Sequence, residues 1–257
     1  MHLPQRIARA VLFSDVHLGW AVCSTHHARW LRALPEVVDD AELVVLNGDV
    51  VDGHRRIHRA AERDLVDGLT ALVVQWRREG RTVVPIEGNH DHGGPGPLAP
   101  AHWRLDFLGA GGQRARVLHG HRTSPSSVVW SRYDRLGRRV LAWENRRYAR
   151  HRALRAAYRF APGLLVSAVG FVECSLARRR LPRDFGALAA DADVLVHGHI
   201  HYGPGRGRIG AIPTFRTGSW VSPGHLGTAD RMLRYRRGRF ERVGWSGGRW
   251  RTFDDGR

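Results

Sequence analysis

The sequence predicts an α/β fold built around a layer of parallel strands. Continuous apolar runs, which are typical of buried parallel strands, occur at residues 11–13, 43–46, 82–86, 117–118 and 194–196. A helical pattern separates the second run from the third, and the order strand, helix, strand favours parallel pairing. Within three residues each run meets Asp, Asn or His, and ligands bind beyond the carboxyl ends of such strands. We therefore expect the chemistry of this chain at one edge of its sheet.

Two helices and a set of later strands complete the predicted fold. Residues 26–34 and 60–78 predict helices, because their apolar residues recur at helical spacing. Residues 212–221 predict a strand and a turn, and residues 232–245 predict a hairpin that turns at Arg237-Gly238. These later strands alternate in polarity, so we expect them to form a second, more antiparallel sheet.

The strand pattern stops between the fourth and the fifth apolar run. Residues 129–143 have the spacing of an amphipathic helix, and the more apolar residues 164–176 predict a second helix beyond Pro162-Gly163. We interpret residues 124–182 as a helical cap, inserted into a single domain of residues 1–257 and standing over the edge of the sheet. The alternative is a pair of helices that only covers the sheet.

The composition indicates anionic partners. The formal net charge is +17, and all 41 basic residues are arginine. A bias in composition explains the choice of arginine, but the excess over 24 acidic residues favours phosphorylated substrates, acidic lipid surfaces or nucleic acid. Because Cys23 and Cys174 are the only cysteines, we expect no disulfide scaffold. No apolar run has the length of a signal peptide core or a membrane span, so the sequence predicts a cytoplasmic location.

Five strand ends carry residue types that bind metal ions. In chain order they are Asp15-x-His17, Gly48-Asp49-x-x-Asp52, Gly88-Asn89-His90-Asp91, His119-Gly120-His121 and Gly198-His199-x-His201. A single histidine at a strand end is more often hydrogen-bonded than metal-bound, but an ordered set of five is specific. Carboxylates, imidazoles and an amide oxygen suit Mn, Fe or Zn, and soft thiolates are missing.

This ordered set resembles the calcineurin-like metallophosphoesterase family over residues 15–201. The resemblance implies a calcineurin-like αββα sandwich, two packed β-sheets with helices outside, that holds two divalent metal ions. Manganese is the expected metal, with iron or zinc as alternatives. The implied ligands are Asp15, His17 and His201 for one ion, Asn89, His119 and His199 for the other, and Asp49 as the bridge. A bridging carboxylate lowers the repulsion between two such ions.

The resemblance also implies a reaction, the hydrolysis of a phosphoester or diphosphate bond by a metal-bridging hydroxide. His90 resembles the catalytic histidine of the family, which acts on the leaving oxygen as a general acid or stabilises the phosphate. Asp52 resembles the carboxylate that orients this histidine. Asp91 is expected to hold the turn of the third motif.

The cap lies where the UDP-2,3-diacylglucosamine diphosphatase branch of the family has a helical insertion. The segment Trp143-Glu144-Asn145-Arg146-Arg147 resembles that branch, so Arg122, Asn145, Arg146 and Arg147 are candidate substrate-binding residues. Two motifs depart from the branch, because His121 replaces its usual Asp and His90 replaces the Arg of its best-known members. We therefore expect a lipid-linked or nucleotide-linked diphosphate as substrate, with a UDP-linked acyl sugar as one example.

Other functions remain open at this point. A phosphodiesterase or nuclease would use the same metal site, although no nucleic-acid-binding motif is present and no specific nucleic-acid partner is expected. A non-enzymatic scaffold is disfavoured, because all seven matched ligand positions are filled. Peripheral contact with an anionic membrane is a further hypothesis, since the apolar residues 164–176 are followed by Arg178-Arg179-Arg180.

Overall fold

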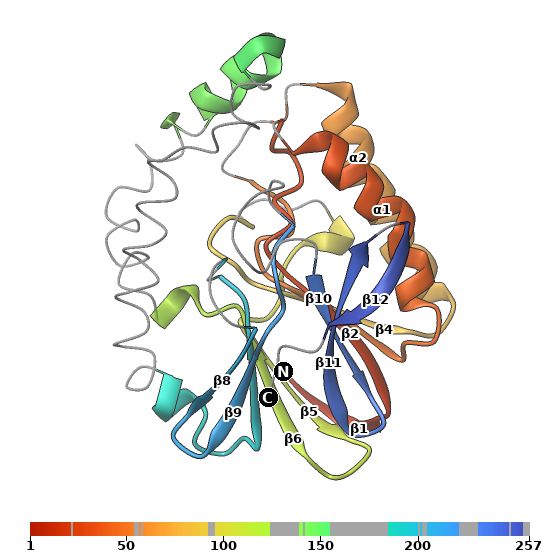
Figure 1. Cartoon of the computed structure of the whole chain (residues 1–257), viewed down its shortest axis with the longest axis vertical. Helices are drawn as coiled ribbons and strands as arrows, with labels where there is room; N and C mark the ends of the chain where they lie inside the picture. The colour runs from red at the N-terminus through yellow and green to blue at the C-terminus, as the bar shows by residue number, and fades with distance from the viewer. Residues whose placement is uncertain are drawn as a thin grey trace.

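The computed structural model describes most of the chain outside the cap. The described residues are 1–21, 23–53, 57, 59–91, 96–123, 139–140, 142–154, 185–199, 201, 205–220, 231–246 and 248–253. Most of the predicted cap, including the whole of the helix expected at 164–176, lies outside these residues. The described strands form two sheets that pack against each other (Figure 1).

The first sheet contains the parallel strands that the sequence predicts. Its order is β12-β11-β10-β2-β3-β4, in which β2, β3 and β4 are parallel and β10, β11 and β12 are antiparallel. The bounds are β2 (Arg9–Phe13), β3 (Leu43–Asn47), β4 (Thr82–Ile86), β10 (Arg231–Arg236), β11 (Arg239–Ser246) and β12 (Arg249–Phe253).

The second sheet is mixed and has the order β1-β5-β6-β7-β9-β8. Strands β6, β7 and β9 run parallel, as do β1 and β5, while β5 pairs antiparallel with β6 and β8 pairs antiparallel with β9. The bounds are β1 (His2–Ile7), β5 (Arg104–Gly109), β6 (Arg114–Leu118), β7 (Val194–His197), β8 (Arg206–Ile209) and β9 (Ile212–Arg216).

The core consists of layers on both faces of the first sheet. Along β2, Leu12 faces the second sheet and packs near Phe107, whereas Phe13 packs with Trp30 of helix α1 (Ser24–Val38). Helix α2 (Ala60–Arg78) covers the same outer face as α1, as Figure 1 shows. A strand buried on both faces needs apolar side chains at every position, which explains the continuous apolar runs.

The outer face of the second sheet is covered as well. Phe185 and Ala189 pack against Leu118 and Leu195 of this sheet, and residues 185–188 are helical. The order of layers is therefore helix, sheet, sheet, helix. This confirms the predicted fold of two packed β-sheets flanked by helices.

The later strands correct one expectation. The hairpin of β10 and β11 is present, and Arg237 and Gly238 both have the positive φ that its tight turn needs. The expectation that it belongs to a separate antiparallel sheet is wrong, because β10 pairs with β2 and places Leu233 opposite Leu12. Alternation in polarity predicts that a strand has one buried face, but it does not identify the neighbouring strand.

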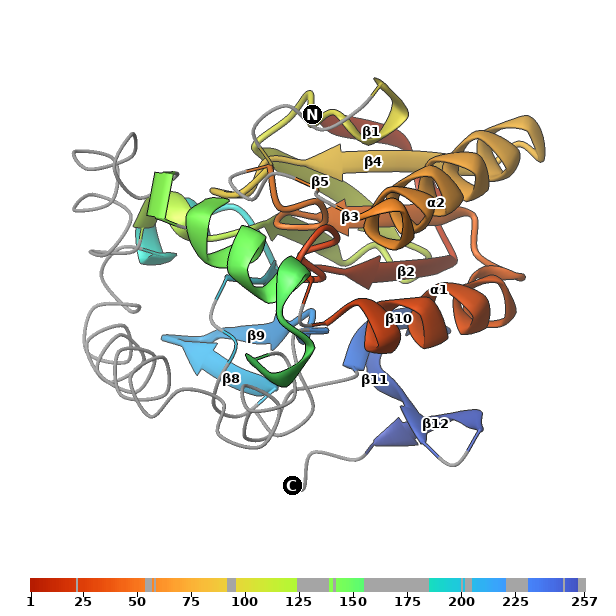
Figure 2. The same ribbon diagram turned by 90° about the horizontal axis from the view of Figure 1, so that it is seen from above.

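Some helical residues of the predicted cap contact the loop that follows β2, where Asn145 meets Gly19 and Ala21. Residues 139–140, 142–150 and 152–154 are helical and lie at the top of Figure 1, and Figure 2 shows the same helical residues from above. Residues 124–138 and 155–184, which contain the rest of the predicted cap, are outside the described residues. In the part of the chain that the structure describes, we find no helix with the length and apolar character needed to span a membrane.

Candidate metal centre

The loops after β2 and β3 lie side by side and carry the first two motifs. The Asp15 amide donates to the Gly48 carbonyl at 3.0 Å, and the His17 amide donates to the Asp49 carbonyl at 2.9 Å. The Asp52 amide donates back across the same pair of loops, to the Leu18 carbonyl at 2.9 Å. The hydrogen bonding of the parallel strands thus continues past their ends, and it holds Asp15, His17 and Asp49 in a fixed register.

The backbone of the predicted ligands is strained. Among the described residues, the non-glycine residues with positive φ are Asp15 (53°), His17 (51°), Asp49 (54°), His199 (66°) and the hairpin residue Arg237 (53°). Such conformations cost about 1–3 kcal/mol each and persist where the surrounding structure imposes them, often at functional sites. Four predicted metal ligands share this conformation, so the position of their side chains is reached at a cost in folding stability.

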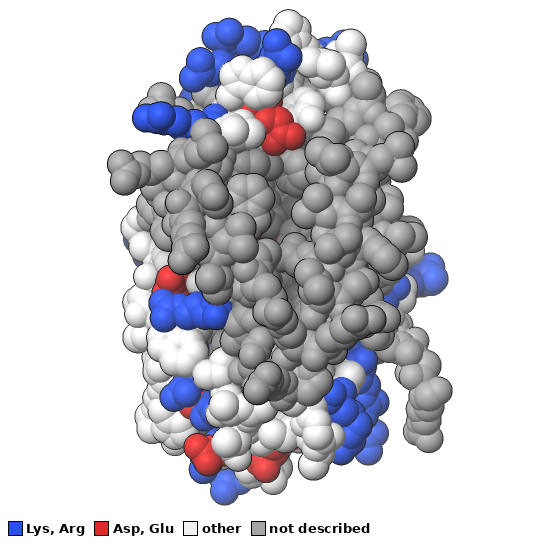
Figure 3. Space-filling view, turned by 90° about the vertical axis from the view of Figure 1, so that its left-hand side faces the viewer, with Lys and Arg blue, Asp and Glu red and all other residues white. Residues whose placement is uncertain are grey.

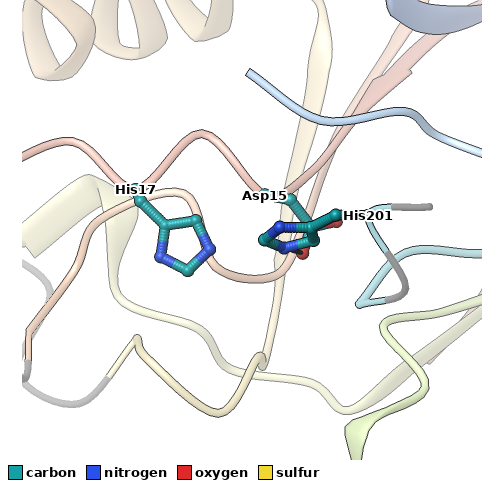
Figure 4. A group of neighbouring side chains, drawn as sticks. All are labelled: Asp15, His17 and His201. Carbon is teal, nitrogen blue, oxygen red and sulfur yellow. Dashed lines mark hydrogen bonds and ion pairs between the residues drawn. The ribbon is translucent and has the colours of Figure 1, made fainter. Parts of the chain in front are cut away.

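The two predicted carboxylate ligands are held in the same way. Asp15 Oδ2 accepts hydrogen bonds from the Ser14 hydroxyl and from the His199 amide (3.0 Å), while Oδ1 lies 2.9 Å from His201 Nε2. Figure 4 shows the His201 ring meeting the Asp15 carboxylate, with His17 to one side. One oxygen of Asp15 is therefore fixed by neighbouring groups, and the other faces the imidazoles.

Asp49 repeats this arrangement between the two groups of ligands. Its Oδ1 accepts the His90 amide at 2.7 Å. Its Oδ2 lies 3.2 Å from His119 Nε2 and 3.8 Å from His17 Nε2, and these two histidines are predicted to bind different ions. The position between them is the one that a bridging carboxylate needs.

The donor atoms fit divalent cations. The His119 Nδ1 atom lies 2.8 Å from the Asn47 carbonyl, so its N–H donates there and directs the Nε2 lone pair into the site. His17 Nε2 and Asn89 Oδ1 are buried and make no hydrogen bond within the described residues. Buried polar atoms normally have partners. Three groups have ligand atoms within 4.8 Å of one another: Asp15–His17–His201, His17–Asp49–His90 and Asp49–His119–His199.

The electrostatics of the site demand positive charge. Burial raises the pKa of Asp15, but the facing His201 and His119 outweigh burial and lower the pKa to about 2. Burial likewise raises the pKa of Asp49, and His119 and His90 bring the pKa well below its usual range. Burial lowers the pKa of His119, yet Asp49 and Asp15 raise it to about 10. Two buried, ionised carboxylates therefore need positive charge beside them, and divalent cations would supply that charge most directly.

Asp52 contacts two histidines rather than one. Its carboxylate is buried, with Oδ1 lying 3.2 Å from His90 Nδ1 and Oδ2 lying 3.4 Å from His17 Nδ1. The contact with His90 is the one that the family resemblance implies. The contact with the predicted ligand His17 was missed in the sequence, although Asp52 follows Asp49 closely enough to lie in the same loop.

Asp91 ties the third motif to the second. Its carboxylate accepts the amides of Asp49 (2.6 Å), Val50 (3.0 Å) and Gly88 (2.9 Å), as a residue that holds this turn should. Burial and the neighbouring Asp49 raise its pKa to about 7. A Cβ atom on Gly88 would lie 2.3 Å from Asp49 Oδ1, so glycine is required for this close approach.

The remaining motif histidines lie beside the site. Burial and His119 lower the pKa of His121 to about 3, and burial and Arg216 do the same for His197. Neither belongs to a group whose ligand atoms converge within the described residues. Thr217, whose hydroxyl meets that of Ser14, is a supporting residue that sequence spacing could not identify, since 203 positions separate the pair.

The candidate substrate residues differ in their surroundings. Asn145 is buried, and its carboxamide accepts the Ala21 amide and donates to the Gly19 carbonyl, each at 3.0 Å. Arg146 and Arg147 are exposed, and Arg147 lies 4.5 Å from the centre of the Trp143 ring. Arg122 is exposed too and pairs with Glu87 at 2.7 Å, near the third motif. Substrate binding by these four residues stays a prediction.

Comparison with known proteins gives the class of this chain. The sequence profile of the calcineurin-like phosphoesterase family matches residues 8–203, so the chain belongs to that family and is a metal-dependent phosphoesterase. Members of this family use a dinuclear site for divalent metals, with which the Asp and His clusters agree. No curated protein sequence matches the chain.

The solved structures that resemble this chain are distant from it in sequence. The phosphoesterase Yfce from E. coli is 18% identical over 91% of both chains, with a TM-score of 0.47. A dimetal phosphatase from Danio rerio is 13% identical over 96% of this chain and 99% of that chain, with a TM-score of 0.44. A predicted phosphoesterase from Streptococcus pneumoniae is 17% identical over 97% and 98%, with a TM-score of 0.37.

Proposed function

We propose that this chain is a dinuclear-metal phosphohydrolase that cleaves a phosphoester or diphosphate bond. The observation that carries the proposal is Asp49, whose Oδ2 faces His119 and His17 from between two clusters of donor atoms. The proposed ligands are Asp15, His17 and His201 for one ion and Asn89, His119 and His199 for the other, with Asp49 shared. We propose manganese as the native metal, with iron and zinc as alternatives, because the donors are imidazole and hard oxygen without thiolate.

The residues around the ions have separate tasks. When bound, two divalent ions lower the pKa of a coordinated water and stabilise negative charge on a phosphoryl group. Asp52 holds His90 through Nδ1, so proton transfer by this ring runs through Nε2. The His90 side chain is 20% exposed, which lets it reach a bound substrate. We assign His90 the protonation of the leaving oxygen, with Asp52 orienting the ring and favouring its charged form.

The proposed substrate is a lipid-linked or nucleotide-linked diphosphate, such as a UDP-linked acyl sugar. Arg146 and Arg147 are exposed residues of the helical segment 142–150. A guanidinium group can donate two parallel hydrogen bonds to the oxygens of a phosphate. Figure 3 shows basic side chains gathered at the top of the view, where residues 139–154 lie. The basic side chains at this end of the molecule support an anionic substrate.

A second candidate is a phosphodiesterase acting on nucleotides. Its support is Trp103, which is 38% exposed and lies beside Arg104 (5.1 Å from the ring centre) and Arg122 (5.6 Å). An exposed aromatic ring next to guanidinium groups suits a base that is attached to a phosphate. Arg122 also contacts Glu87, one residue before the third motif, and this contact supports a nucleotide-binding patch close to the proposed metal ligands.

A substrate comparison separates these candidates. Protein stripped of metal and reloaded with Mn²⁺, Fe²⁺ or Zn²⁺ is assayed on bis(p-nitrophenyl) phosphate, a UDP-linked acyl sugar and a dinucleotide. Much faster turnover of the acyl sugar supports the diphosphatase, and preference for the dinucleotide supports the phosphodiesterase. We expect Asp49→Ala to abolish turnover while Asp64→Ala, on the exposed face of α2, leaves it unchanged. Wild-type turnover in Asp49→Ala would refute the assignment.

We also propose a cytoplasmic enzyme that contacts the anionic face of a membrane. The support among the described residues is the set of exposed apolar side chains Val140, Trp143 and Leu154, which stand among arginines. Flotation with phosphatidylglycerol-containing and neutral liposomes tests this. We expect co-flotation with the anionic liposomes at low salt only, and its absence there would contradict the proposal.

A further inference from the structure

A buried side chain, Asn145, connects the predicted cap to the loop that follows His17. Asn145 belongs to the helical residues 142–150 and is 1% exposed. Its Oδ1 accepts the Ala21 amide at 3.0 Å, and its Nδ2 donates to the Gly19 carbonyl at 3.0 Å. The carboxamide therefore makes two hydrogen bonds to the backbone of a loop that lies more than 120 positions earlier in the chain.

The loop to which Asn145 is hydrogen-bonded is short and carries a predicted ligand, His17. The Trp20 amide donates to the His17 carbonyl at 3.1 Å, and Gly19 between them has a φ of +103°. His17 itself has a strained φ of 51°. A strained loop keeps its shape only if contacts impose it, and Asn145 supplies two such contacts immediately after His17.

The same helical segment has a second inward contact. Tyr148 follows Asn145 by one helical turn and packs on the buried Trp20 and Cys23. Arg146 and Arg147 lie on the exposed side of the segment. One face is therefore anchored to the loop after His17, and the opposite face presents the proposed phosphate-binding arginines.

We propose that Asn145 is a positioning residue that couples the cap to the metal centre by fixing the loop of His17. The inference rests on the proposed dinuclear site. It replaces direct substrate contact as the role of Asn145, because the oxygen and the amino group of its carboxamide each hold the backbone of this loop. Side chains that orient metal ligands typically change metal affinity by about 10–100-fold when they are removed.

The test compares Mn²⁺ binding and activity in Asn145→Ala with the wild type. We expect the affinity for one of the two ions to fall about tenfold, as measured by equilibrium dialysis. The Mn²⁺ concentration for half-maximal activity should rise by the same factor, and excess Mn²⁺ should restore most of kcat. Arg152→Ala, an exposed change at the end of the same segment, is the matched control and should bind Mn²⁺ as the wild type does.

Asn145→Asp provides a second variant if the alanine substitution prevents folding. It keeps an oxygen for the Ala21 amide but turns its second oxygen toward the Gly19 carbonyl, so the hydrogen bond to Gly19 is lost and we expect the Mn²⁺ affinity to fall here as well. Wild-type Mn²⁺ affinity in either folded variant, together with a lower melting temperature, would show a purely structural contact and overturn the inference. If the wild type binds no second ion, the proposed dinuclear site fails instead, so the two failures are distinguishable.

Discussion

The substitution Asp52→Asn tests how the site prepares His90 for proton transfer. Asp52 is buried and contacts His90 Nδ1 at 3.2 Å and His17 Nδ1 at 3.4 Å. Asparagine keeps the size of the side chain but removes its charge. A hydrogen bond to a charged group stabilises by about 1.5–3 kcal/mol, and a neutral one by about 1 kcal/mol. The loss at His90 is then about 0.5–2 kcal/mol, and a factor of ten in rate corresponds to about 1.4 kcal/mol.

We therefore expect kcat of Asp52→Asn to fall about 2–30-fold at saturating Mn²⁺. Because Asp52 also holds His17, the Mn²⁺ concentration for half-maximal activity should rise as well. The assay is steady-state hydrolysis of bis(p-nitrophenyl) phosphate across a Mn²⁺ titration, with Asp64→Asn on α2 as the control.

A double variant separates the two roles of Asp52. If Asp52 acts on the chemical step through His90, then Asp52→Asn should add little to the kcat loss of His90→Ala at saturating metal. Independent effects would multiply. A multiplied loss, or a wild-type kcat in Asp52→Asn, would refute the reasoning that His90 depends on this carboxylate.

Three further changes probe the supporting structure. Gly88→Ala places a Cβ 2.3 Å from Asp49 Oδ1 and 2.4 Å from its amide, so the metal content of the purified protein should fall; wild-type content would contradict the close approach. Asp91→Asn turns an amino group toward backbone amides, so it should lower the free energy of unfolding by about 2 kcal/mol in urea titrations, and an unchanged midpoint would count against this. Burial lowers the pKa of His27 to about 3, against 6.5 in the unfolded chain. Between pH 6.5 and pH 3 the unfolded state therefore binds a proton that the folded state does not, so the free energy of unfolding falls as the pH falls. From pH 6 to pH 5, His27→Leu should lose about 1 kcal/mol less unfolding free energy than the wild type, and identical losses would contradict a neutral, buried His27.

The parallel strands β2, β3 and β4 and the predicted ligands could be identified from the sequence for clear physical reasons. Strands β2, β3 and β4 are buried on both faces, so they are continuous apolar runs that end at polar residues. Since parallel strands end at one edge of a sheet, the residues that follow them converge. The order of the five motifs resembles the calcineurin-like family, and this resemblance indicated the individual ligands.

Other parts of the fold left a weak signal. Strands β1, β8 and β12 lie at sheet edges and contain arginines at exposed positions, so their apolar pattern is short. The pairing of β10 with β2 joins residues that lie more than 200 positions apart, and local alternation says nothing about such a partner.

The supporting contacts of the site could not be predicted either, because they also join residues that lie far apart in the sequence. Ser14 meets Thr217 across 203 positions, and Asn145 meets Gly19 across 126. The sequence marks Ser14, Thr217 and Asn145 as polar. Only the folded chain shows which backbone or hydroxyl group each one holds.

The most direct test of the proposed centre is the electron paramagnetic resonance spectrum of the protein loaded with two equivalents of Mn²⁺. Two ions that share Asp49 would lie about 3.5–4 Å apart, close enough for their spins to couple. We expect a coupled Mn²⁺ signal in the wild type, and in Asp49→Asn its replacement by the six-line signal of isolated ions. An isolated-ion spectrum from a fully active wild type, or a coupled signal that survives in Asp49→Asn, would contradict a dinuclear site bridged by Asp49.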